Sequence, residues 1–95
     1  MHVIVLGGAD GQLACIAAAR RLGAEVTVVD PRSDVPGIAL CDSWIDCDVM
    51  DTASIVARAA HANAVLTDQS DYAARAASLL STALGLAGNS PDLLE

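Results

Sequence analysis

Two polar stretches of the sequence carry residue types that could bind a small molecule. Residues 7–12 combine consecutive glycines with Asp10 and Gln12, and residues 67–71 read Thr-Asp-Gln-Ser-Asp. Backbone N–H groups in a glycine turn ahead of a helix suit anionic or strongly polar groups, and carboxylates pair with amines. We therefore expect a site for a small polar molecule, such as an amine or an amino acid. The candidate substrate-binding residues are Gly7, Gly8, Asp10, Gln12, Asp68, Gln69, Ser70 and Asp71.

The same residues also have a purely structural interpretation. Asp10 would cap the first helix, and Ser70 or Asp71 would cap the helix that follows the second stretch, because these residue types favour helix starts. Gly7 and Gly8 would only let a strand and a helix pack closely. The sequence leaves both interpretations open.

Asp30 raises a second binding hypothesis. It ends a β-rich run, where dinucleotide-binding folds place the acid that holds the ribose of NAD. The glycines read Gly-Gly-Ala-Asp-Gly from position 7, however, and not G-x-G-x-x-G. Asp10 would also bring negative charge toward a pyrophosphate. Asp30 is therefore a cofactor-binding candidate only under this alternative, a small NAD(P)-binding domain.

No other group of residues indicates catalysis or metal binding. Cys15, Cys41 and Cys47 lack CxxC spacing, which favours reduced, buried thiols. His2 and His61 lie far apart in the sequence, and neither has a partner at metal-ligand spacing. We assign no catalytic residue and no metal ligand.

The elements that must position these residues alternate between strands and helices. Strands are expected at 3–6, 25–29, 43–47 and 64–67, and helices at 11–22, 52–62 and from about 72 to 84. Four βα units in a row predict an α/β fold, a small Rossmann-like open parallel sheet of order 3-2-1-4 with helices on both faces. Leu86–Asn89 would form a fifth strand or a connection. In this order the two polar stretches meet at the carboxyl ends of strands 1 and 4, where such sheets bind ligands.

Composition narrows the class of protein. The 95 residues carry a formal net charge of −7, five arginines and no lysine, which argues against nucleic-acid binding and rules out a P-loop. The hydrophobic fraction is 54%, yet no run is long enough to cross a membrane, and no basic segment precedes the first strand. We expect a cytoplasmic protein with no membrane partner.

Three motifs, in order, resemble one known family. Val3–Pro31, Thr67–Tyr72 and Leu84–Pro91, which reads Leu-Gly-Leu-Ala-Gly-Asn-Ser-Pro, are similar to the N-terminal (pre-ATP-grasp) domain of ATP-grasp ligases. That superfamily includes biotin carboxylase, carbamoyl-phosphate synthetase and several purine-pathway ligases. The resemblance covers essentially the whole chain. It departs from the purine-ligase pattern at Ala9-Asp10, where a further glycine often stands.

The resemblance implies an ATP-dependent carboxylate–amine ligase that works through an acyl phosphate. Residues 1–89 would form the pre-ATP-grasp domain, and residues 90–95 would start the linker helix to a missing C-terminal ATP-grasp domain. ATP and Mg²⁺ would be bound by that later region, so the fragment alone would hold no cofactor and would not be an enzyme. Its partners would be the missing domain, a small polar carboxylate or amine substrate, and a second copy of the chain. A third hypothesis is a fragment without ligand that self-associates through apolar surface.

Overall fold

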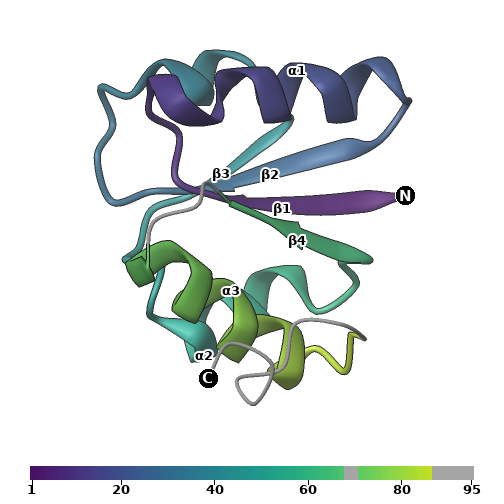
Figure 1. Ribbon diagram of the computed structural model, residues 1–95, viewed down its shortest axis with the longest axis vertical. Coiled ribbons are helices and arrows are strands. Elements are labelled where there is room, and N and C mark those ends of the chain that lie inside the picture. Colours follow the sequence, from purple (N-terminus) through teal and green to yellow (C-terminus); the bar gives the residue numbers. More distant parts are fainter. Residues whose placement is uncertain (68–70, 87–95) are drawn as a thin grey trace.

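The computed structural model describes residues 1–67 and 71–86 and contains a parallel sheet (Figure 1). Its strands are β1 (His2–Leu6), β2 (Glu25–Val29), β3 (Ser43–Ile45) and β4 (Ala64–Leu66). They lie in the order β3-β2-β1-β4 and all pair in parallel. The predicted fold class and strand order are confirmed. Leu86, the first residue of the expected fifth strand, is not in a strand, and the rest of that segment and the proposed linker at 90–95 lie outside the described part of the chain.

Helices cover both faces of the sheet, as predicted (Figure 1). On one face lie the 3₁₀ turn η1 (Asp10–Gln12), helix α1 (Leu13–Arg21) and the 3₁₀ turn η2 (Pro36–Ala39). On the other lie α2 (Thr52–Ala59) and α3 (Asp71–Ala83), which pack against each other. Within the described residues, no helix is long and apolar enough to cross a membrane.

The central strand explains why two layers of helices are needed. Every residue of β1 is buried, and successive side chains point to opposite faces. Val3 and Val5 pack with Ile16 in the cluster beneath α1. Ile4 and Leu6 belong to a larger cluster shared with α2 and α3. Burial on both faces is what the unbroken apolar run of β1 predicts.

The structure corrects several predicted boundaries. The first helix begins at Leu13 because residues 10–12 form the tighter 3₁₀ turn, and it ends before Leu22, whose exposed fraction is 88%. The third strand ends at Ile45, where the backbone N–H of Cys47 folds back to the Ile45 carbonyl (3.1 Å). The second helix ends at Ala59 rather than near 62.

Asn63 follows the second helix, in a position where an asparagine can act as a C-cap, but it does not cap that helix. It joins β1 instead, with its Oδ1 accepting from the His2 N–H (2.7 Å) and its own N–H donating to the His2 carbonyl (2.7 Å). The α2–β4 connection is thereby fixed to the start of β1.

Candidate functional site

The glycine turn after β1 is shaped by its two glycines in different ways. Gly7 has a φ of 98°, a conformation that L side chains rarely adopt, and its N–H donates to the Val29 carbonyl (2.7 Å). Gly8 lies in a tight space, since an added Cβ would come within 2.9 Å of a Val35 methyl and 3.0 Å of a Val28 methyl. Its carbonyl accepts from the Gly37 N–H (2.7 Å). The close-packing interpretation therefore accounts for Gly8.

Asp30 holds this turn to the end of β2. Its exposed fraction is 1%, and its Oδ2 accepts from the Gly8 N–H (3.0 Å). Arg32 donates to both carboxylate oxygens, from Nε to Oδ1 and from Nη2 to Oδ2 (both 2.9 Å), and the Arg32 backbone N–H also reaches Oδ1 (2.9 Å). These bonds, chiefly those from the Arg32 side chain, lower the pKa of Asp30 to about 2 against the opposing effect of burial. Trp44 donates from its indole Nε1 to the Asp30 carbonyl (2.7 Å), which further fixes the backbone at the end of β2.

The Asp30 geometry bears on the dinucleotide hypothesis. A ribose-binding acid must present free acceptor oxygens to the ligand. Both Asp30 oxygens already accept two hydrogen bonds each from the protein. Asp30 thus stabilises the turn and has no oxygen directed at a ligand.

The two polar stretches converge at the carboxyl end of β1. The buried side chain of Gln12 donates from Nε2 to the Leu6 carbonyl (3.1 Å), and Thr67 donates from Oγ1 to the same oxygen (3.4 Å). Asp10 lies nearby in the chain, exposed in the first turn of η1. The N-cap residues of η1 and α1 are Ala9 and Gln12, so Asp10 does not cap the first helix as one interpretation held.

The remaining candidates of the second stretch lie at the edge of the described structure. Asp68, Gln69 and Ser70 are outside the described residues. Asp71 is the first residue of α3. The described part of the site is therefore a polar edge made by Gly7, Asp10, Gln12 and Thr67, next to the Asp30–Arg32 ion pair. Such an edge offers an exposed carboxylate to a cationic or hydrogen-bonding group.

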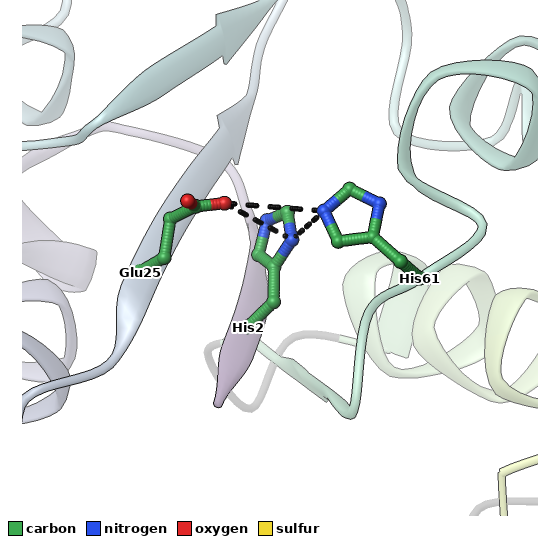
Figure 2. Close-up of side chains that lie close together, drawn as sticks. All are labelled: His2, Glu25 and His61. Atoms are coloured by element: carbon green, nitrogen blue, oxygen red, sulfur yellow. Dashed lines mark hydrogen bonds and ion pairs between the residues drawn. The ribbon is translucent and has the colours of Figure 1, made fainter.

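A second group of polar side chains lies at the other end of the strands, where β1 and β2 begin. His2 begins β1, Glu25 begins β2, and His61 follows α2, and Figure 2 shows their side chains directed toward one another. The sequence interpretation noted only that the two histidines lie far apart in the sequence, and it did not anticipate that their rings are in contact. The matching starts of two parallel strands place His2 beside Glu25, but nothing local in the sequence places His61.

Comparison with solved structures gives the chain a fold shared with large synthetases. N5-carboxyaminoimidazole synthetase from Staphylococcus aureus, complexed with ADP, is 18% identical with a TM-score of 0.71, over 85% of this chain and 22% of its own. Phosphoribosylglycinamide synthetase from Anaerococcus prevotii is 20% identical with a TM-score of 0.76, over 92% of this chain and 23% of its own. Glycinamide-RNase-transformylase T from Mycobacterium tuberculosis is 21% identical with a TM-score of 0.70, over 88% of this chain and 25% of its own.

No protein family model matches the sequence, and no curated protein matches it. The chain spans about a quarter or less of the length of these three structures. The resemblance to ATP-grasp ligases, drawn from three sequence motifs, is confirmed at the level of the fold.

Proposed function

We propose that this chain is the N-terminal substrate-binding and docking domain of an ATP-dependent carboxylate–amine ligase of the ATP-grasp type. The observation that carries the proposal is the shared fold: nearly all of this chain superimposes on less than a quarter of two synthetases. A module of a larger enzyme would correspond to such a part of it, which supports the proposal. One of those structures is complexed with ADP, which supports ATP as the nucleotide of the parent protein.

In this proposal the polar edge at the carboxyl end of β1 contacts the substrate. Asp10 is exposed there, and Gln12 and Thr67 fix the local backbone through the Leu6 carbonyl. The substrate is a small polar carboxylate or amine, and Asp10 pairs with a cationic group on it. ATP, Mg²⁺ and the reacting groups belong to the rest of the parent protein, so the domain alone does not turn over ATP.

An apolar groove supports the docking half of the proposal. It has a volume of about 360 Å³ and runs between α1 and the β1–β4 edge of the sheet. It is lined by Met1, Val3, Cys15, Ala18, Ala19, Leu22, Ala24, Ala64 and Leu66. Leu22 and Leu66 are 88% and 36% exposed, and covering such side chains contributes favourably by removing apolar surface from water. We propose that the missing domain covers this groove.

Self-association is the second candidate, and the same groove favours it. The two candidates differ in whether the complete protein dimerises as its concentration rises. If the groove is a docking surface, the rest of the complete protein covers it, and dimers form only when the 95-residue chain is studied by itself. Analytical ultracentrifugation of both forms separates them, because a complete protein that also dimerises through the groove contradicts the docking role.

The functional test uses the complete reading frame that contains this chain. We expect ADP formation that depends on a small carboxylate and an amine, and we expect Asp10→Asn to raise the KM of one substrate while leaving ATP affinity unchanged. The matched control is Asp46→Asn, which also removes an exposed charge, after β3, the strand farthest from β4. A complete protein without ATP turnover, or equal effects of the two variants, would contradict the proposal.

A further inference from the structure

The side-chain cluster at the amino edge of the sheet has the geometry of a metal site. His2 Nδ1 lies 3.4 Å from Glu25 Oε2, and His61 Nε2 lies 3.9 Å from the same oxygen. The two ring nitrogens are in hydrogen-bond contact with each other (Figure 2). All three donor atoms lie within 4.8 Å of one another. Two imidazole nitrogens and a carboxylate oxygen therefore converge on one point.

Three parts of the fold bring these side chains together: β1, β2 and the α2–β4 connection. His2 and Glu25 are register partners in the parallel β1–β2 pair, so their side chains share a face of the sheet. His61 is held close by the two Asn63–His2 bonds that join the α2–β4 connection to β1. Tertiary structure thus assembles the cluster from residues that are distant in the sequence, since Glu25 and His61 follow His2 by 23 and 59 positions.

His2 also has an outer hydrogen-bond partner for its second ring nitrogen, as metal-binding histidines generally do. Its Nε2 lies 2.6 Å from Thr27 Oγ1, a buried contact on the neighbouring strand. When Nε2 carries the proton and donates to this hydroxyl, the lone pair of Nδ1 faces Glu25 and His61. Burial, together with His61, lowers the pKa of His2 despite the opposing effect of Glu25, which favours the neutral imidazole that a metal requires.

We propose that His2 Nδ1, His61 Nε2 and Glu25 Oε2 bind one Zn²⁺ ion, with water as the fourth ligand. Nitrogen and carboxylate oxygen ligands are typical of zinc, and tetrahedral ligands at zinc bond lengths lie roughly 3.3–3.6 Å apart. The His2–Glu25 separation already fits this spacing. The side chains of His61 and Glu25 are 64% and 57% exposed, so they can move by the small amount that the ion requires and leave a position open to water.

The proposed ion would connect β1, β2 and the α2–β4 connection at one point. It lies at the opposite end of the strands from Asp10 and Gln12, so it is separate from the proposed substrate-binding residues. Since the ion binds only the folded arrangement, Zn²⁺ should raise the thermal midpoint of unfolding.

The test is calorimetric titration of the chelator-treated 95-residue chain, with nothing added before Met1, with Zn²⁺. We expect one ion per chain with micromolar or tighter affinity, weakened at least about tenfold in His61→Ala and in Glu25→Gln, as loss of a ligand should do. Thr27→Val should weaken binding by about tenfold through the outer partner of His2. Asp46→Asn is the charge-matched control and should bind as the wild type does. Circular dichroism checks that each variant is folded.

Cysteine binding is the competing explanation, and Co²⁺ separates the two. Burial raises the pKa of the Cys15, Cys41 and Cys47 thiols, which disfavours the thiolate form. We expect a tetrahedral Co²⁺ spectrum without a thiolate charge-transfer band, and unchanged binding when all three are replaced by serine. No binding by the wild type, binding unaffected by both His61→Ala and Glu25→Gln, or binding lost in the serine variant would overturn the proposal.

Discussion

Replacing Asp30 by asparagine tests how the glycine turn is held to the sheet. The carboxylate accepts four hydrogen bonds, from the Gly8 N–H and from three N–H groups of Arg32. An asparagine keeps one acceptor oxygen but places an NH₂ donor against N–H groups of Gly8 or Arg32 that the carboxylate accepts from. The charge that pairs with Arg32 is also lost. The variant should therefore be less stable without any change in side-chain volume.

The pKa of Asp30 sets the magnitude and the pH dependence. Its value falls from 3.8 to about 2 on folding, and since one pKa unit corresponds to about 1.4 kcal/mol, ionised Asp30 contributes about 2 kcal/mol. Because the folded pKa is the lower one, this contribution is fully present above about pH 4 and is lost as the pH falls toward about 2.

The assay is urea unfolding of the wild type and Asp30→Asn, followed by circular dichroism at a series of pH values. The free energies of unfolding should differ by about 2 kcal/mol at neutral pH, and the difference should shrink as the pH is lowered below about 4. Asp46→Asn, an exposed control, should change stability by less than about 0.5 kcal/mol. A difference under that size at neutral pH, or one that does not change with pH, would refute the role of Asp30.

Two packing predictions follow from the same structure. Gly8→Ala should lower the free energy of unfolding by about 1–3 kcal/mol, because the added Cβ would meet two valine methyls. Gly11→Ala should be tolerated, because a Cβ at that position would lie in open space. Urea unfolding of both variants measures the difference. Leu80→Ala should cost about 2–5 kcal/mol since Leu80 is fully buried between the sheet and α2, while the exposed Leu22→Ala should change the thermal midpoint little. Equal effects within either pair would contradict the packing described here.

The layout of the fold was predictable because its signals are local. The apolar run of β1 and the alternation of strand and helix were enough to predict a parallel sheet of order β3-β2-β1-β4. Gly23 and Gly85, which follow the first and third helices, take positive φ values of 85° and 74°, as glycines that end helices commonly do. The convergence of Gln12 and Thr67 on the Leu6 carbonyl follows from that topology.

The contacts that depend on tertiary structure were not predictable. Asp30 looked like a ribose-binding acid because its position suits one, and only the conformation of the following loop brings Arg32 onto both its oxygens. The two histidines lie 59 positions apart, and their contact depends on Asn63, whose place just after a helix gives no sign of a bond to β1. In each case a side chain accepts a hydrogen bond from a backbone N–H that is distant in the sequence, and no local sequence pattern indicates such a bond.

The central claim is that this chain is one module of an ATP-dependent ligase, and reading the coding sequence past the codon for Glu95 tests it most directly. We predict that the frame continues into a region that makes up most of the protein and contains a glycine-rich loop and paired acidic residues suited to Mg²⁺. A stop codon directly after Glu95, or a continuation without those features, would contradict the claim.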